Sequence, residues 1–296
     1  MAMSLRGQAL AEFDLPAAPQ RIDEFPPPWV GVEVCRVHAP AGRFLLICSD
    51  GALAVAFEAT LFDLLVEARY PAPRPRRARS GSLIAKLTRP DGGGAAAAAC
   101  YAWLPGEELA AATATVPQLL EVGRLLARLH QLGETHPASV PETVGAASLA
   151  ARLPPGPDRD ALSPILEAAL PPLPTGAVHG GLRPEKALFV GDRCSAVLPS
   201  GLACSAALVL DMAEAALGWM LGAARPAAAL RALVSGYQAL RRLSPEEKDA
   251  MWPALRFAAA RDGARRVATG RAGARAALTA VEAVGEQDVR AATGQF

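Results

Sequence analysis

One segment of the chain, residues 178–215, has the order of side chains expected of a catalytic loop. A His-Gly pair at His179 is followed by an apolar run, a Gly-Asp turn, a second apolar run and a helix that opens on an acid. An active site with this layout would carry carboxylates and a carboxamide in this segment. The positions where we expect those groups hold Gly181, Lys186 and Pro199. The segment therefore keeps the layout of an active site without its reactive groups.

The elements expected to position this segment change in character near residue 105. Before that point, short runs rich in Val, Leu, Ile and Phe predict five strands, at residues 31–37, 43–49, 52–58, 82–87 and 97–104. Asp50-Gly51 lies between the second and third runs and is a strong hairpin signal. A helix is predicted at residues 60–70. Residues 90–94 are predicted to be a hairpin turn, because they lack the strand-to-helix context and the Lys-Ser/Thr pair of a phosphate-binding loop.

Beyond the Leu-Pro-Gly sequence at residues 104–106, apolar side chains recur at helical spacing. They predict five helices, at residues 116–132, 158–170, 206–221, 226–243 and 244–267. A short β insertion is predicted around residues 187–198. We therefore expect an α+β chain with a β-rich N-terminal lobe at residues 1–104, a hinge near 104–106 and a helical C-terminal lobe at 105–296.

This order of elements and motifs resembles the aminoglycoside phosphotransferase and choline kinase-like superfamily. A β-rich lobe, a Leu-Pro-Gly hinge, a helix that ends in Leu-Ala-Arg-Leu-His at 126–130 and a His-Gly motif follow one another as they do there. The segment most resembles that of type II homoserine kinases. The shared frame is His179, Leu182, Pro184, Leu188, Phe189, Gly191, Asp192, Arg193, Ser195, Ala203, Cys204 and Asp211. The resemblance implies a bilobal protein-kinase-like fold with a small antiparallel β-rich lobe and a larger, mainly helical lobe.

The resemblance also implies which functional groups are missing. Gly181 stands where the family has the Asp that deprotonates the acceptor hydroxyl, and Lys186 where it has a magnesium-binding Asn. Pro199 stands where a second Asp holds the metal ions against the nucleotide phosphates. A Lys or Arg on the third strand should reach those phosphates, but the matching run is apolar around Val55. Asp63 is the candidate for the acidic partner on the helix that follows.

These losses favour a protein that has given up phosphoryl transfer. Catalysis of that reaction consists of positioning and electrostatic stabilisation, with Mg²⁺ bridging the phosphates. Glycine and proline offer no side-chain ligand, and Lys186 has the wrong charge to hold a metal. We therefore expect no catalytic residue, metal site or cofactor. Two exceptions stay open: Lys186 leaves an anion-binding pocket where a metal once lay, or Glu185 serves as a base in a different chemistry.

Other residues of the motifs are predicted to be structural or to line a cleft. His130 ends a helix and is expected to cap or pack, while the resemblance implies that Asp211 ties its helix to the loop and that His179 shapes that loop. The candidates for lining a cleft between the lobes are Trp103, His179, Arg183, Glu185 and Lys186.

Composition excludes several classes of function. A net charge of +1 gives no general attraction to nucleic acid or to an acidic membrane surface. The arginine-rich stretches lack the interleaved aromatic residues of nucleic-acid binders. The N-terminus has no apolar signal-peptide core, and no uninterrupted run of about 20 apolar residues predicts a membrane span. Five scattered cysteines suit a reducing compartment, so we expect a cytoplasmic protein.

Three functions remain open from the sequence. The favoured interpretation is an inactive, homoserine kinase-like pseudokinase that binds a small ligand in the cleft or docks on a protein partner. The second is a divergent small-molecule kinase that uses ATP and Mg²⁺ to phosphorylate the hydroxyl of an amino acid or amino alcohol. The third is a structural subunit that pairs with an active relative, in which the side chains of Trp103, Phe57 or Arg183 fill the cleft. A homo-oligomer also stays open.

Overall fold

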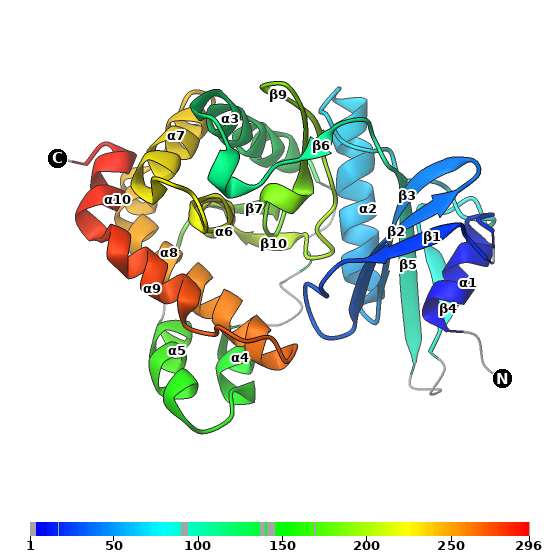
Figure 1. The fold of residues 1–296 in the computed structure, drawn as a ribbon, viewed down its shortest axis with the longest axis horizontal. Coiled ribbons are helices and arrows are strands. Elements are labelled where there is room, and N and C mark those ends of the chain that lie inside the picture. Colours follow the sequence, from blue (N-terminus) through cyan, green and yellow to red (C-terminus); the bar gives the residue numbers. More distant parts are fainter. Residues whose placement is uncertain are drawn as a thin grey trace.

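An antiparallel sheet region and a larger helical region make up the chain, which confirms the predicted α+β class (Figure 1). The computed structural model describes residues 4–16, 18–89, 94–136, 140, 146–168 and 170–295. The glycine-rich turn predicted at 90–94 lies almost wholly outside the described residues. Within the described residues, no helix is long and apolar enough to cross a membrane.

The N-terminal sheet has five strands in the order β1-β2-β3-β5-β4, and every neighbouring pair is antiparallel. Their bounds are β1 (Arg21–Glu24), β2 (Val32–Ala39), β3 (Gly42–Ser49), β4 (Ala85–Thr88) and β5 (Ala95–Ala102). Helix α1 (Leu5–Glu12) packs on one face of this sheet and α2 (Ala52–Glu67) on the other. Since alternate residues of a strand face opposite sides, β3 is buried continuously from Phe44 to Cys48.

Residues 52–58 were predicted to be a strand, and this prediction is wrong. They form the first half of α2, and Gly51 is its N-cap, so Asp50-Gly51 is a strand-to-helix junction rather than a hairpin turn. The buried side chains of α2 recur at helical spacing, through Val55, Ala59 and Phe62. A short apolar run fits either a strand or a buried helix, and residues 52–58 cannot form a hairpin with β3 because β2 and β5 occupy both of its edges.

The helical region holds eight of the described α-helices. They are α3 (Val116–Gly133), α4 (Ala146–Arg152), α5 (Pro157–Glu167), α6 (Leu208–Met220), α7 (Pro226–Gln238), α8 (Pro245–Ala268), α9 (Ala276–Val284) and α10 (Glu286–Thr293). Helices α3 and α7 approach closely because each carries a glycine at the contact. A Cβ on Gly123 would lie 2.0 Å from the carbonyl oxygen of Leu233, and one on Gly236 would lie 2.1 Å from that of Leu120.

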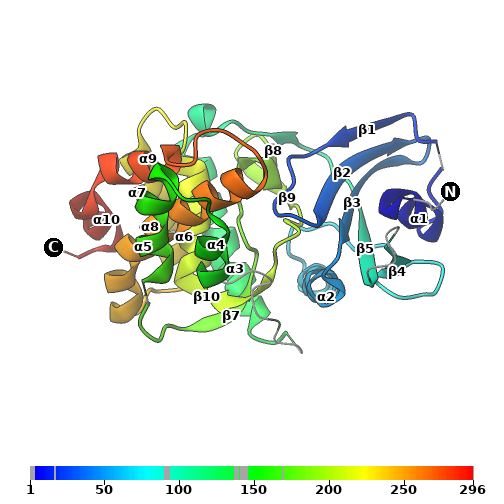
Figure 2. The same cartoon turned by 90° about the horizontal axis from the view of Figure 1, so that it is seen from below.

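Two small sheets hold the segment that resembles a catalytic loop. One pairs β7 (Thr175–Val178) with β10 (Cys204–Ala207), and the other has the order β6-β8-β9. The bounds of the latter strands are β6 (Glu107–Glu108), β8 (Ala187–Val190) and β9 (Arg193–Val197). The loop between β7 and β8 and the loop between β9 and β10 both face the sheet region (Figure 2). The chain passes from β5 to β6 at the same junction.

Candidate active site

Asp211, in the first turn of α6, holds the start of the loop that follows β7. Its carboxylate accepts hydrogen bonds from the backbone N–H groups of His179 at 2.8 Å and Gly180 at 2.9 Å. The ring of His130 bridges this carboxylate, at 3.0 Å, and the hydroxyl of Tyr237, at 2.7 Å. Burial opposes ionisation of Asp211, but the hydrogen bond and charge of His130 lower its pKa below the ordinary value. Asp211 and His130 therefore fix the loop from behind, fully inside the protein.

His179 links the two loops of the segment. Its side chain is fully buried, and its Nε2 atom lies 2.9 Å from the carbonyl oxygen of Leu198. Burial lowers the pKa of the imidazole, and because a carbonyl oxygen can only accept, Nε2–H donates this bond. The backbone N–H of Leu198 in turn donates to the carbonyl of Lys186, at 2.8 Å. These bonds hold Leu198 and the adjacent Pro199 beside the loop that follows β7. Because its side chain is fully buried, His179 cannot contact a ligand in a cleft.

The three positions expected to carry reactive groups lack them. Gly181 has a φ of +129°, a conformation that side-chain-bearing residues rarely adopt, and a Cβ at this position would have only the Arg183 Nε atom nearby, at 3.8 Å. Pro199 is buried and has no polar side-chain atom. Across the described residues, no cluster of three or more His, Cys, Asp or Glu side chains is placed to hold a metal ion. The backbone at residue 181 thus suits glycine better than a residue with a side chain.

Glu58 is the residue of this site that the sequence analysis missed. Its carboxylate projects from α2, is 2% exposed, and accepts hydrogen bonds from the Ser200 N–H at 3.0 Å, the Ser200 hydroxyl at 3.2 Å and the Gly201 N–H at 2.9 Å. Burial raises its pKa above the ordinary value, and these hydrogen bonds oppose that shift. Asp63, the acid considered on this helix, instead pairs with Arg74 on the surface at 3.0 Å. The sequence did hold one signal for this buried carboxylate, because Glu58 is an isolated acid within the apolar run at residues 52–62.

Val55 does not occupy the position that the sequence analysis assigned to it. It lies on α2 and packs in the core that α2 shares with the sheet, because residues 52–58 are helical. The third strand of the structure is β3, whose buried residues 44–48 are all apolar. No cation therefore projects from the middle of this strand toward the loops.

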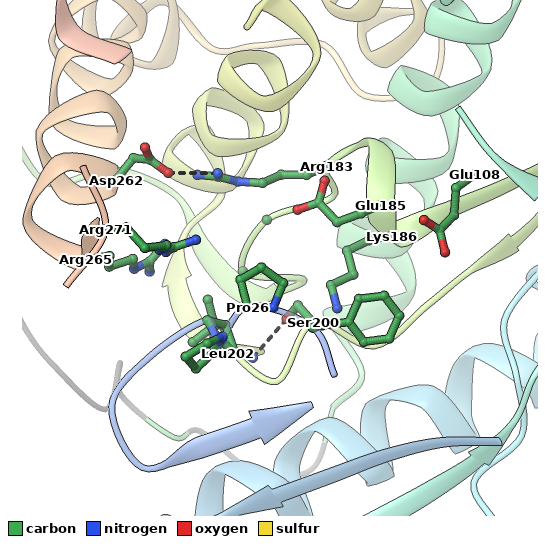
Figure 3. A pocket seen from close by; sticks show the side chains of 15 residues that line it. Pro26, Glu108, Arg183, Glu185, Lys186, Ser200, Leu202, Asp262, Arg265 and Arg271 are labelled. Carbon is green, nitrogen blue, oxygen red and sulfur yellow. Dashed lines mark hydrogen bonds and ion pairs between the residues drawn. The ribbon is translucent and has the colours of Figure 1, made fainter. Parts of the chain in front are cut away.

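A cavity of about 350 Å³ opens between the two regions beside the loop (Figure 3). The segment Phe25–Pro28, which connects β1 to β2, forms one wall, and Gly180, Gly181 and Leu202 contribute to another. The charged or polar side chains that line it are Glu108, Arg183, Glu185, Lys186, Ser200, Asp262, Arg265 and Arg271. Glu185 and Lys186, two of the residues predicted to line a cleft, extend from the same turn (Figure 3). Arg265 and Arg271 lie on the opposite side of Pro26 from Lys186.

Arg183 belongs to an ion-pair network that braces this wall. It lies 2.8 Å from the carboxylate of Asp262 and 3.2 Å from that of Glu214. Glu214 is fully buried and also pairs with Arg261 at 2.7 Å and with Arg265 at 3.7 Å. Burial opposes its ionisation, but the three arginines lower its pKa to about 2. The Arg183 guanidinium is therefore already neutralised and holds the loop to α6 and α8.

Lys186 differs from Arg183 because no hydrogen bond or ion pair joins its ammonium to any of the described residues. Its Nζ atom lies 5.4 Å from the centre of the Phe25 ring. Burial lowers the pKa of the ammonium, although Glu185, Glu58 and Glu108 act in the opposite direction. A cation with so few partners at the edge of a cavity is available to a ligand.

Trp103, the remaining candidate, is enclosed at the junction of the two regions. Its ring stacks on that of Phe25, with centroids 6.5 Å apart, and the guanidinium of Arg36 lies 4.6 Å from its centre. Arg36 also pairs with Glu108 of β6 at 3.3 Å. These side chains pack against one another beside the hinge; Phe25 and Glu108 also line the cavity, but Trp103 does not. Phe57, also considered as a plug, is buried in the core under α2.

Comparison with known proteins identifies the group to which this arrangement belongs. A family model described as a phosphotransferase enzyme family matches residues 30–258. A homoserine kinase of Caulobacter sp. (strain K31) is 31% identical over 247 residues, which cover 76% of this chain and 74% of that protein. The structure of amicoumacin kinase hAmiN in complex with AMP-PNP, Ca²⁺ and Ami has a TM-score of 0.69 at 11% identity, over 94% of this chain and 89% of that one. A microcompartment-associated aminopropanol kinase has a TM-score of 0.62 at 15% identity, over 97% of this chain and 94% of that one.

Proposed function

The chain belongs to the phosphotransferase enzyme family, and we propose that it is a member that binds a small molecule without transferring phosphate to it. The observation that carries this proposal is the replacement of three expected metal- and proton-handling groups by Gly181, Lys186 and Pro199. The surrounding frame is intact, since Asp211 and His179 still hold both loops. Such a protein is a pseudokinase that retains a ligand cavity.

The physical argument concerns the charge that develops during phosphoryl transfer. Mg²⁺ bridges the phosphates and neutralises that charge, and it needs carboxylate or carboxamide oxygens to hold it. Lys186 supplies one positive charge at this place, but it cannot bridge phosphates as a metal does. The loss of a general base at residue 181 alone accounts for a rate loss of about 10²- to 10⁴-fold. The loss of metal ligands as well removes the main stabilisation of the transition state.

The cavity supports a binding role. Its far wall is fixed by the ion pairs of Arg183 and Glu214, and Glu58 ties the sheet region to Ser200 and Gly201. A site whose walls are held by buried charged networks is preorganised, which favours ligand binding because little order is lost on association.

A second candidate is a small-molecule kinase that phosphorylates an amino acid or amino alcohol hydroxyl. The 31% identity to a homoserine kinase and the fold shared with an aminopropanol kinase favour it. In that case Glu185 and Glu108 would have to hold Mg²⁺, because they are the carboxylates of the cavity lining that do not pair with Arg183. Their simultaneous replacement by glutamine would then abolish activity.

Calorimetric titration with ATP, with and without Mg²⁺, separates the two candidates. The pseudokinase predicts that Mg²⁺ leaves the affinity for ATP unchanged or that ATP does not bind. An affinity that rises at least tenfold with Mg²⁺ in the wild type, but not in a Glu108→Gln, Glu185→Gln double variant, would establish the kinase instead. The exposed pair Glu67→Gln, Glu282→Gln is the control for loss of two carboxylates.

A further inference from the structure

We propose that the Lys186 ammonium anchors a compact oxyanion, a carboxylate or a phosphate, carried on a small apolar body in the cavity. This inference rests on the proposed binding function and names its ligand class. The geometry around Lys186, the partners of the nearby carboxylates and the lining of the cavity support it independently.

Hydrogen bonds hold the backbone of Lys186, whereas its ammonium has no hydrogen bond to the described residues. The residue ends the 3₁₀ turn Pro184–Lys186, its N–H donates to the Arg183 carbonyl at 2.9 Å, and its carbonyl accepts from Leu198 at 2.8 Å. The side chain extends into the cavity (Figure 3), and its Nζ atom lies 5.4 Å from the centre of the Phe25 ring. Among the described residues, none forms a hydrogen bond or ion pair with its Nζ atom. The chain therefore presents a placed ammonium whose three N–H donors are left for a ligand or solvent.

The carboxylates near Lys186 either have other partners or are exposed to solvent. Glu58 accepts hydrogen bonds from three donors, the Ser200 N–H, the Ser200 hydroxyl and the Gly201 N–H. Glu108 pairs with Arg36 at 3.3 Å. Glu185 is exposed to solvent. A cation that is partly withdrawn from water, and that no neighbour neutralises directly, is stabilised by a bound anion.

The remainder of the cavity defines the body of the ligand. Phe25, the three prolines at 26–28 and Leu202 form an apolar surface, and Gly181 leaves space beside the loop. The guanidinium of Arg271 lies across the cavity from Lys186, which disfavours a cationic ligand (Figure 3). A volume of about 350 Å³ corresponds to about a dozen water molecules, so it suits a ligand of about a dozen non-hydrogen atoms. A phenyl ring that carries one phosphate or carboxylate fits this description.

Titration calorimetry with phenyl phosphate, phenylacetate and the neutral phenylacetamide tests the inference, in a buffer without carboxylate or phosphate. The protein variants are wild type, Lys186→Met, and Lys86→Met on the exposed side of β4 as the matched control. At least one anion should bind the wild type and the Lys86→Met variant, and phenylacetamide should bind neither. Lys186→Met should weaken anion binding by about 10- to 100-fold, as expected for loss of a hydrogen bond to a charged group.

A second measurement uses the wild-type protein alone and does not depend on how a variant folds. The chain has three lysines, Lys86, Lys186 and Lys248, and peptide mapping after brief acetylation reports each one. The bound anion should slow acetylation of Lys186 several-fold and leave Lys86 and Lys248 unchanged.

The failure of this inference is distinct from failure of the proposed function. Three results would each overturn it: equal anion affinity in wild type and Lys186→Met, unaltered acetylation of Lys186 with bound anion, or no anion binding at 10 mM. None of them would affect the pseudokinase proposal. Magnesium-dependent phosphate transfer, measured in a separate assay, would overturn that proposal whatever the role of Lys186.

Discussion

Replacement of Glu58 by glutamine tests how α2 is held to the loop at residues 200–201. The carboxylate is buried and accepts hydrogen bonds from both backbone N–H groups and from the Ser200 hydroxyl. Glutamine keeps the shape and one acceptor oxygen but places an NH₂ group where the second oxygen was. At low pH, where Glu58 is protonated, the variant should lose about 1 kcal/mol of unfolding free energy, because the NH₂ group cannot accept from the Gly201 N–H, which lies 3.2 Å from the second oxygen.

The effect of pH follows from the raised pKa of Glu58. Between its ordinary pKa and its higher pKa in the folded protein, the folded state binds more protons than the unfolded state. The stability of the wild type therefore falls as pH rises through this window, by at most about 1.4 kcal/mol per pH unit from this group. Glutamine does not titrate, so the contribution of residue 58 becomes independent of pH. The unfolding free energy of Glu58→Gln, relative to wild type, should consequently increase as pH rises above 4.5.

Urea unfolding followed by tryptophan fluorescence, in steps between pH 4 and pH 8, measures this difference. The control Glu67→Gln removes an exposed carboxylate from the same helix and should change stability by less than about 1 kcal/mol. Parallel profiles for wild type and Glu58→Gln over the whole range would refute the argument, because they would show that Glu58 ionises as easily in the folded state as in the unfolded chain.

Three further substitutions make independent predictions, each measured by thermal or urea unfolding. Asp211→Ala should cost about 3–5 kcal/mol, because two backbone N–H groups and His130 lose a buried acceptor; a loss below about 1 kcal/mol would contradict this role. Glu214→Ala should cost a similar amount, since it removes the buried carboxylate that pairs with Arg183, Arg261 and Arg265, whereas Glu282→Ala on the surface should cost less than about 1 kcal/mol. Gly181→Asp should lose about 1–3 kcal/mol because of its positive φ, and a more stable variant would show that the loop accommodates a side chain.

The sequence was sufficient for the architecture and for the frame of the loop. Short apolar runs give way to apolar residues at helical spacing near residue 105, and the structure has its five-stranded antiparallel sheet before that point and eight of its described α-helices after it. The order of motifs from residue 126 to Asp211 likewise predicted the superfamily, which the match over residues 30–258 confirms. Both features are patterns of residue type and order along the chain, so the sequence alone reveals them.

The contacts that shape the cavity could not be predicted from such patterns. The run at 52–58 is apolar enough for a strand, but it is helical, and the long-range pairing of β3 with β5 takes the edge where a hairpin partner would lie. Because that run was assigned to a strand, Glu58 had no predicted direction and its bond to residues 200–201 was missed. Arg183 pairs with Glu214 and Asp262, which follow it by 31 and 79 residues. Such partners are set by how α6 and α8 pack, and spacing in the sequence does not reveal them.

The central claim is that this cavity binds a small molecule and does not carry out phosphoryl transfer. The most direct measurement is ³¹P NMR of the purified protein with ATP and Mg²⁺, in the presence of homoserine and of 1-amino-2-propanol. The account predicts that no phosphate ester forms at high protein concentration beyond the rate without protein. A phosphate ester that requires Mg²⁺, and that disappears in the Glu108→Gln, Glu185→Gln variant, would contradict it and establish a small-molecule kinase.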